Sequence, residues 1–378
     1  MSTRKVNATI SASTIKGVVE KHGSPVLILS RSKLVANYRK FHKLLPRVKV
    51  FYAVKANPHP DVVKAFLAEG LNFDVASRSE IELTLSLGAK PEQLVFANTV
   101  KNPEALALAS RKGVHLMTFD SEYELIKIRK LCPKARLLVR IKVPNVGSLV
   151  ELSLKFGCEV SDAVPLMLKA QSMGLQCVGV SFHVGSQCRQ VENFIDAFDM
   201  VSMILNEARQ KGLNLDTVDI GGGFPTDVNG EGEYAVFTRM TSVLAKELDR
   251  VFPKEVKIIA EPGRILVASA ATLAARVVGK AIRENKHWYY LDDGIYGTLS
   301  GIVFDHAQYK FHTLRRGNPL ISTLAGPTCD SLDIITRSVD LPYLYMDDIV
   351  YVNNIGAYST GTATHFNGIS PAKVVAIP

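Results

Sequence analysis

The chain has 378 residues, of which 47% are hydrophobic and 21% charged, a composition typical of a globular protein with a large core. This length predicts one very large domain or two domains. No apolar run approaches the roughly 18 residues that cross a bilayer, and the N-terminal sequence MSTRKVNATI lacks the apolar stretch of a signal peptide. Length and composition therefore argue against membrane insertion and secretion.

Charge and cysteine usage narrow the class further. Lys and Arg (45) outnumber Asp and Glu (36), but the basic residues are scattered, so we expect no nucleic-acid partner. The cysteines are odd in number and form no CxxC pair, which argues against a disulfide scaffold and a zinc site: Cys132, Cys158, Cys177, Cys188 and Cys329. We therefore predict a cytoplasmic protein without a metal.

The segments at 25–30 (PVLILS) and 30–45 (SRSKLVANYRKFHKLL) have the patterns of a strand and a helix. Short β-branched runs then alternate with segments of helical period, such as HPDVVKAFLAEG and VENFIDAFDMVSMILNEARQKG, which indicates βα units and a parallel sheet. Eight strands are predicted, at 48–54, 72–77, 94–99, 115–120, 135–143, 176–184, 217–223 and 257–263. Eight such units match an α/β fold of the (β/α)8 barrel type.

The last third of the chain has a different pattern. Its strand-like runs are separated by turn residues, with few helical segments, which predicts a mainly antiparallel β domain. The segment at 25–30 has no place among the eight barrel strands, so we expect it to pair with this domain. The predicted domains are the barrel at 31–266 and a β domain formed by 1–30 and 267–378.

The predicted strand ends are rich in reactive residues. In a barrel of this kind, function lies in the loops that follow the carboxyl ends of the strands. The residues at or beside those ends are Lys55, Asp74, Arg140, His183, Gly221, Gly222, Gly223, Glu261, Gly263 and Arg264. This concentration predicts a catalytic site at the barrel mouth.

An amine and an anion cradle define the expected chemistry. Lys55 alone is better explained as a lysine reaching solvent, whereas a tight turn is the less favoured explanation of the glycines alone. Together, a lysine nucleophile and a glycine cradle with Arg264 form the arrangement that pyridoxal phosphate (PLP) requires. Glu261 is then the expected partner of the pyridine nitrogen, and His183 the residue stacked on the ring.

Eight separated motifs extend this interpretation from about residue 25 to the C-terminus: FYAVKANP, FDVAS, SLKFG, SFHVGSQC, DIGGGFP, AEPGR, GPTCDSLD and NNIGAYS. In this order they resemble those of the fold-type III PLP-dependent basic amino-acid decarboxylases, most closely the ornithine decarboxylases. The resemblance implies an alanine racemase-like barrel joined to a β domain. It also implies a head-to-tail homodimer with active sites at the interface.

The resemblance also assigns roles residue by residue. It makes Lys55 the Schiff-base lysine, with Asp74 near the cofactor hydroxyl, and it makes Cys329 the acid that returns a proton to the α-carbon in the partner's site. The remaining cofactor-binding residues that it implies are Arg140, His183, Ser186, Gly222, Gly223, Glu261, Gly263, Arg264 and Tyr358. Lys155 and Asp333 resemble a pair that forms an ion pair across the dimer interface.

Substrate choice depends on three further residues. Asp305 and Asp330 are the expected acceptors of the substrate's distal ammonium, and Phe304 stands where these enzymes often have Tyr. Ornithine fits best, giving putrescine and CO2 for polyamine biosynthesis. Lysine or dual lysine/ornithine decarboxylation is the alternative, and arginine decarboxylation or an inactive regulatory relative is less favoured. A racemase needs a second base on the opposite ring face, and Cys329 with the paired Asp residues suits decarboxylation better.

Overall fold

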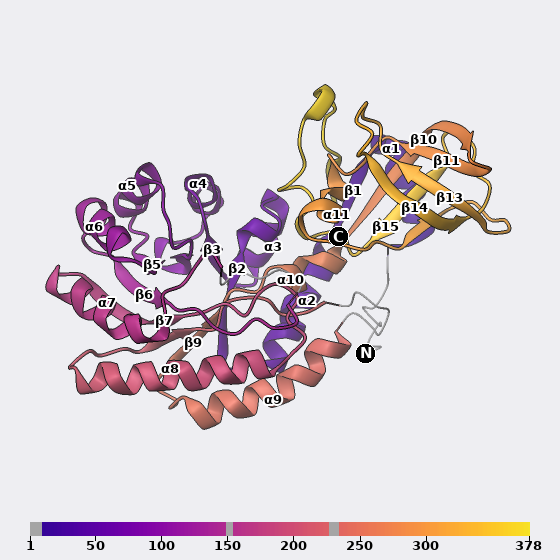
Figure 1. Ribbon diagram of the computed structural model, residues 1–378. Coiled ribbons are helices and arrows are strands. Elements are labelled where there is room, and N and C mark those ends of the chain that lie inside the picture. Colours follow the sequence, from indigo (N-terminus) through magenta and orange to yellow (C-terminus); the bar gives the residue numbers. More distant parts are fainter. Residues whose placement is uncertain (1–9, 149–153, 227–233) are drawn as a thin grey trace, which may run out of the picture. The chain divides into compact units, whose positions relative to one another are not determined.

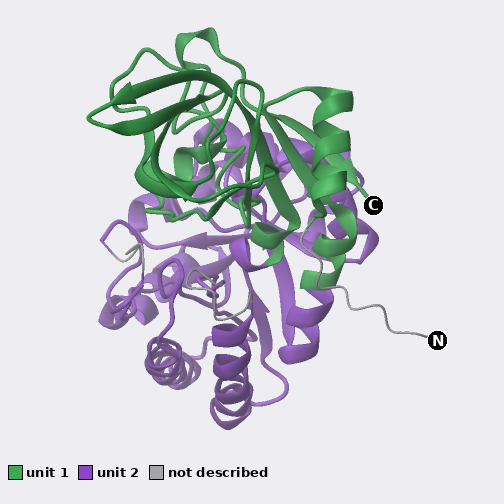
Figure 2. Cartoon of the chain, turned by 90° about the vertical axis from the view of Figure 1, so that its right-hand side faces the viewer, with its two compact units in different colours: residues 1–37, 266–378 green, residues 38–265 purple. Residues whose placement is uncertain are grey.

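The computed structural model describes residues 10–148, 154–226 and 234–378, so the first residue of the SLKFG motif, Ser153, lies outside the described residues. The chain divides into two compact units, one of residues 38–265 and one of residues 1–37 with 266–378 (Figure 2). The first division falls within helix α2 (Arg31–Leu44), whereas the sequence placed a boundary just before this helix.

Residues 38–265 form the barrel unit (Figure 1). Eight parallel strands pair in chain order and close when the last pairs with the first, which confirms the predicted barrel. The strands are β2 (Val48–Ala53), β3 (Asn72–Val75), β4 (Leu94–Phe96), β5 (Leu116–Phe119), β6 (Arg136–Arg140), β7 (Gln176–Ser181), β8 (Thr217–Asp219) and β9 (Lys257–Ala260).

Several strands end earlier than their apolar patterns suggest. β7 ends at Ser181 rather than Val184, and β8 ends at Asp219 rather than Gly223. After β8 the backbone leaves the strand conformation, because Gly221 and Gly223 have φ of +65° and +89°. His183 and the three glycines therefore lie in loops, where the chain is free to shape a site.

The helices that cover the barrel have clear local causes. Asn102 caps α5 by accepting from the N–H of Glu104 at 2.9 Å, and Pro103 occupies the first helical turn. After α2 the helices are α3 (Pro60–Ala68), α4 (Arg78–Ser86), α5 (Pro103–Lys112), α6 (Glu122–Leu131), α7 (Val160–Ser172), α8 (Glu192–Gln210) and α9 (Ala235–Val251). Aromatic packing fixes the longest of them, since Phe194 of α8 stacks on Phe224 at 5.5 Å between ring centroids.

The barrel has a packed apolar interior beneath its loops. A buried cluster draws side chains from strands around the barrel: Phe51, Val95, Ala97, Leu138, Val178 and Ile259. Close packing of this kind holds the strand ends in place, so side chains just beyond them are positioned by a rigid scaffold.

Residues 10–37 and 266–378 form the second described unit, a mainly antiparallel eight-stranded sheet. Its strands are β1 (Val26–Ser30), β10 (Ala271–Arg283), β11 (Lys286–Leu291), β12 (Phe311–Thr313), β13 (Leu320–Ala325), β14 (Ile334–Leu341), β15 (Ile349–Asn353) and β16 (Lys373–Ile377). β1 pairs antiparallel with β10 and parallel with β16, which confirms the expected association of residues 25–30.

Two helices of this unit were not expected from the sequence. α1 (Ala12–His22) is capped by Ser11 and packs Ile15 and Val19 into a cluster with residues of β1 and β10. α11 (Gly301–Phe304) is a single turn, which has no periodic pattern to reveal it. β12 and β14 were also missed.

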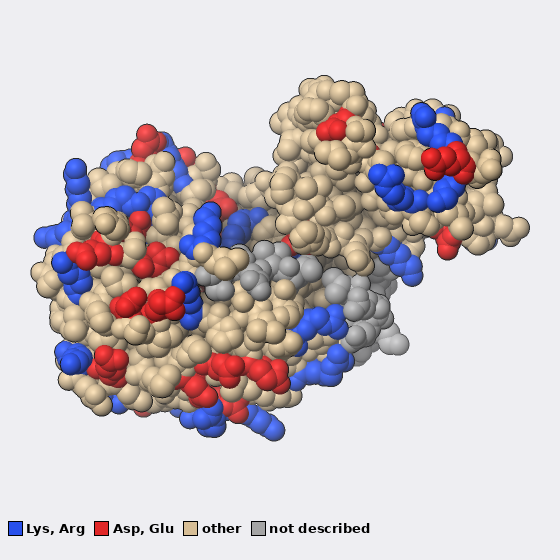
Figure 3. Space-filling view, in the orientation of Figure 1, with Lys and Arg blue, Asp and Glu red and all other residues tan. Residues whose placement is uncertain are grey.

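The surface carries both signs of charge in close alternation (Figure 3). Ion pairs such as Arg78 with Glu82 and Lys169 with Glu122, at 2.9 and 2.8 Å, account for part of this mixture. None of the helices described is long and apolar enough to cross a membrane. All five cysteines are free thiols.

Candidate active site

Lys55 lies at the mouth of the barrel, within the 3-10 turn η1 (Val54–Ala56) that follows β2. Its ammonium forms a close ion pair with Oδ2 of Asp74 on β3, because the register places Ala53 opposite Asp74. The Asp74 side chain is fully buried, whereas that of Lys55 is 41% exposed. The structure thus presents an accessible amine whose position is fixed by a buried carboxylate.

Glu80 is a carboxyl near this pair that the sequence analysis missed. Ser77 caps α4 by accepting from the N–H of Glu80 at 3.2 Å, and Glu80 Oε2 accepts from the N–H of Ala76 at 2.6 Å. Burial raises the pKa of Glu80 to about 7, with the Asp74 charge adding to the rise and the Ala76 N–H and Lys55 opposing it. The Ser-x-x-Glu spacing indicates a helix start, which conceals this proximity to the lysine.

His183 follows β7 and presents a neutral ring. Its Nδ1 accepts a hydrogen bond from the N–H of Gly185 at 3.0 Å. Its pKa is well below the usual value, because burial and then the charges of Arg140 and Lys55 disfavour the imidazolium. The ring lies close to Gly222, where a Cβ would be 3.1 Å from His183 Nε2. A neutral, flat ring beside bare backbone suits stacking on a planar ligand.

The three glycines after β8 let neighbouring backbone approach more closely than any side chain would allow. A Cβ on Gly222 would lie 2.7 Å from the carbonyl oxygen of Glu261, and one on Gly223 only 2.1 Å from that of Gly185. Gly263 is equally restricted, at 2.9 Å from the Cβ of Ala56. Arg264 follows directly at the start of α10 (Arg264–Val267). Bare backbone beside a guanidinium is the chemistry that binds a phosphate.

Glu261 is a buried acid with an unused oxygen. The residue is 6% exposed, and its Oε1 has no hydrogen-bond partner among the described residues. Burial, followed by the charges of Asp219 and Asp74, raises its pKa well above the usual value. A ring nitrogen and a phosphate would satisfy this oxygen and the glycine cradle, so the residues present fit PLP.

The other predicted cofactor-binding residues lie in both units. Arg140 ends β6 and places its guanidinium over the ring of Phe156, 5.2 Å from the centroid. Ser186 is partly buried in the loop after β7. Tyr358 belongs to the β unit, where its φ of 52° marks a turn. Their contacts with a cofactor stay predictions.

Cys329 and Asp330 follow β13 in the β unit. Asp330 accepts from the N–H of Leu332 at 2.9 Å and from the hydroxyl of Tyr296. These hydrogen bonds, that of Leu332 first, lower the pKa of Asp330 and keep it ionised. Cys329 is exposed, and its N–H donates to Oδ1 of Asn367 at 3.1 Å. Tyr296 and Asn367 were not recognised in the sequence, because their partners lie 34 and 38 positions away.

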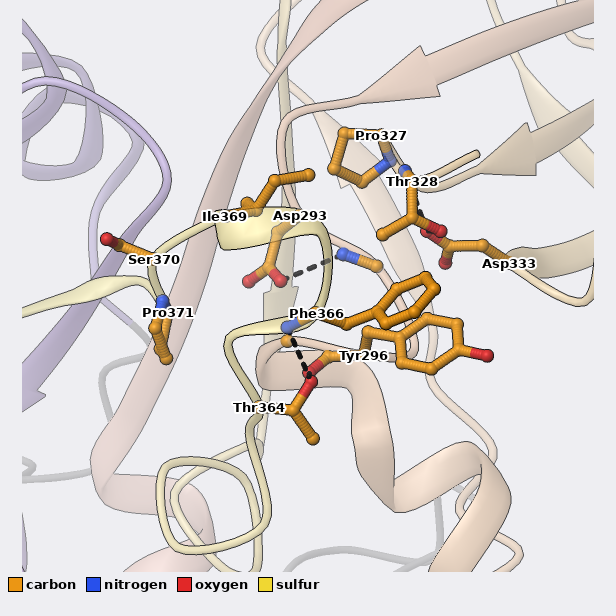
Figure 4. Close-up of a pocket in the computed structure, with 12 residues that line it drawn as sticks. Asp293, Tyr296, Pro327, Thr328, Asp333, Thr364, Phe366, Ile369, Ser370 and Pro371 are labelled. Atoms are coloured by element: carbon orange, nitrogen blue, oxygen red, sulfur yellow. Dashed lines mark hydrogen bonds between the residues drawn. The ribbon is translucent and has the colours of Figure 1, made fainter. Parts of the chain in front are cut away.

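A small hollow lies beside these loops (Figure 4). The ring of Tyr296 stacks on Phe366 at 4.5 Å between centroids. Asp333, also at the hollow, accepts from the N–H of Ile295 and from the N–H and hydroxyl of Thr328, at 3.0, 3.1 and 2.8 Å. These bonds tie the Tyr296 and Cys329 loops together within one chain. The expected ion pair of Asp333 with Lys155 of a partner stays a prediction.

Asp305 and Phe304 lie at the end of α11. Asp305 is 8% exposed and donates its N–H to the carbonyl of Gly301 at 3.0 Å, while Phe304 is 63% exposed. Asp305 is therefore not a solvated surface charge. Its contact with a substrate stays a prediction. Within the described residues, no group of His, Cys, Asp and Glu is arranged to hold a metal ion.

Comparison with known proteins places this site in a family. Residues 31–268 match the family described as pyridoxal-dependent decarboxylase, pyridoxal binding domain. The chain is 38% identical to a lysine/ornithine decarboxylase of Selenomonas ruminantium, over 98% of this chain and 93% of that protein. It is 39% identical to an ornithine decarboxylase of Schizosaccharomyces pombe, over 89% of this chain and 79% of the relative.

Solved structures agree. A lysine/ornithine decarboxylase from Vibrio vulnificus complexed with cadaverine superposes with a TM-score of 0.91 at 36% identity, over 98% of this chain and all of that one. An arginine decarboxylase of Paramecium bursaria Chlorella virus bound to agmatine gives 0.92 at 32% identity, over 97% and 100%. The chain belongs to the pyridoxal-dependent decarboxylases and is a fold-type III carboxy-lyase of basic amino acids that uses PLP.

Proposed function

We propose that the chain decarboxylates L-ornithine to putrescine and CO2. The observation that carries this choice is Asp330, a carboxylate held ionised beside Cys329 by Tyr296 and the Leu332 N–H. With the buried Asp305, it offers two acceptors for a substrate that ends in a simple cation. A substrate with a distal carboxylate would be repelled by the same pair.

The residues of the barrel unit have distinct proposed roles. Lys55 supplies the amine that attaches to the cofactor aldehyde, and Asp74 orients that amine. Gly222, Gly223, Gly263 and Arg264 hold the phosphate, while His183 covers the ring and Glu261 binds its nitrogen. Bound in this way, the cofactor withdraws electrons from the α-carbon and weakens the bond to the carboxylate.

Cys329 completes the proposed reaction by donating a proton to the α-carbon after CO2 leaves. A thiol that gives up its proton needs protection from bulk water, yet Cys329 is exposed in the single chain. This exposure supports a homodimer in which Cys329 acts in the partner's site. The free thiols also support a reducing compartment such as the cytoplasm.

Lysine is the main alternative substrate. It is one methylene longer than ornithine, a difference that a pocket distinguishes by only about 1–3 kcal/mol. Arginine is less favoured, because its planar guanidinium requires a wider acceptor geometry than an ammonium. Product analysis with each amino acid at equal concentration tests this order: putrescine as the main product supports the proposal, and mainly cadaverine or agmatine contradicts it.

Changing the two acceptor carboxylates tests substrate recognition. We expect Asp305→Asn and Asp330→Asn each to raise KM for ornithine by on the order of 10²-fold, since each weakens a contact with the distal ammonium. Cofactor content should stay normal. Asp340→Asn, at an exposed strand position, is the matched control and should leave KM unchanged. Normal ornithine KM in both variants would mean that other groups select the substrate.

Removing the guanidinium at the glycine cradle tests the phosphate site. We expect Arg264→Ala to weaken PLP binding by about 10- to 100-fold, because a charged hydrogen-bond donor to the phosphate is lost. Circular dichroism should show an unchanged fold. The measurement is the PLP dissociation constant of the cofactor-depleted protein, and an unaltered value would place the phosphate elsewhere.

A further inference from the structure

Asp219, a residue outside the predicted site, lies directly behind Glu261. It is the last residue of β8 and has no exposed surface. Its Oδ1 accepts from the N–H of Gly221 at 2.9 Å, and its Oδ2 accepts from the hydroxyl of Ser181 at 3.1 Å. Two donors of this kind favour the ionised form of a buried carboxyl.

The register of the barrel brings this side chain to Glu261. β8 and β9 are adjacent parallel strands in which Asp219 lies opposite Ile259. Glu261 directly follows Ala260, the last residue of β9. The N–H of Glu261 donates to the carbonyl of Gly221 at 2.7 Å, which keeps the two segments together. The two buried carboxyl groups lie close enough to act directly on each other's pKa.

A hydrogen bond between two carboxyl groups requires a proton on one of them. Glu261 is the better donor and Asp219 the better acceptor, because both Asp219 oxygens already accept from other donors. Burial raises the pKa of Asp219 to about 6, and this rise is opposed by Glu261 and then by the Gly221 and Ser181 donors. The other charged groups acting on the pair are Asp74 and Lys55.

We propose that Asp219 is a positioning residue for cofactor binding, which holds Glu261 through a shared proton and leaves Oε1 of Glu261 to accept from the protonated ring nitrogen. The pair then keeps its proton when PLP binds, and the ring nitrogen retains its own. The two carboxyls together carry one negative charge, which matches the single positive charge of a pyridinium. Separate ionisation of both would put two buried negative charges next to Asp74, at high electrostatic cost.

This inference rests on the proposed contact between Glu261 and the ring nitrogen, so its first test needs no cofactor. In the infrared spectrum of cofactor-depleted protein, the Glu261 carboxylic acid band is identified by its loss in Glu261→Gln. We expect Asp219→Asn to shift this band and to lower the pH at which it disappears by at least about one unit, because the acceptor charge is gone. Ser181→Ala, which leaves both carboxyls in place, should retain the band. A band with unchanged frequency and titration in Asp219→Asn would overturn the proposal.

A double-mutant cycle on PLP affinity tests the positioning role. We expect Asp219→Ala to weaken PLP binding about tenfold, since Glu261 loses the bond that holds it. Once Glu261 is Ala, the second change should have no further effect, because Asp219 has nothing left to position. Additive losses would overturn the proposal, since Asp219 would then act only through the glycine turn. If Glu261→Ala itself leaves affinity unchanged, the assignment of Glu261 fails, while the infrared result still decides whether the proton is shared.

Discussion

Lys55→Ala should abolish the visible absorbance of lysine-bound cofactor and lower turnover by at least on the order of 10³-fold, as removal of the nucleophile does in other covalent enzymes. The geometry explains why no other residue replaces it. The amine follows β2 and is held by Asp74 of β3, and its charge acts on the ring of His183. Absorbance spectra and steady-state rates on the purified variant provide the measurement.

Lys55→Ala also removes the charge partner of Asp74, so its effect on the stability of the fold must be measured separately from its effect on catalysis. Asp74 is fully buried, and its Oδ1 has no hydrogen-bond partner among the described residues. Losing the ammonium should cost at most about 3 kcal/mol, because Lys55 is partly exposed and water replaces it in part. Lys55→Arg is the matched control: it keeps a cation beside Asp74 and restores stability, but it still cannot attach the cofactor. Near-normal absorbance in either variant would disprove the assignment.

The barrel was predictable because each strand is a short β-branched run between helical segments, a pattern set by burial on both faces. The positions at which the strands end were harder to predict. The apolar pattern continues through Phe182 and Val184, both buried, although β7 has already ended at Ser181. Buried loop residues and buried strand residues are both apolar, so the sequence pattern does not show where the strand ends.

Some residues of the candidate site are recognisable from the local sequence, whereas others depend on contacts between distant segments. Lys55 and the triple glycine are recognisable from the sequence, because they follow predicted strands and because a purely structural role explains their combination poorly. Asp219 and Glu80 are not, because their importance arises from the β8–β9 register and from a helix cap beside Asp74. Tyr296 likewise gains its role only when the fold brings it to Asp330.

The second large effect concerns the sharing of a site between subunits. Lys55 belongs to the barrel unit, whereas Cys329 belongs to the β unit and is exposed, unlike the four buried cysteines. If each site takes Lys55 from one chain and Cys329 from its partner, a Lys55→Ala dimer and a Cys329→Ala dimer each contain two defective sites. A mixed dimer contains one site with both residues intact and one with neither.

Mixing the two variants should therefore restore activity that neither has alone. With random exchange about half of the dimers are mixed and one of their two sites works, so roughly a quarter of wild-type activity should return. Differently tagged subunits, copurified from a separate portion of the mixture, verify the exchange, while the unfractionated remainder is assayed. A mixture of Lys55→Ala with Lys55→Arg controls for effects of exchange alone. If both residues came from the same chain, every site in the mixture would lack one of them and activity would stay at the level of the single variants. That result would exclude the shared site, and with it the reason for assigning proton donation to a thiol that the single chain leaves open to water.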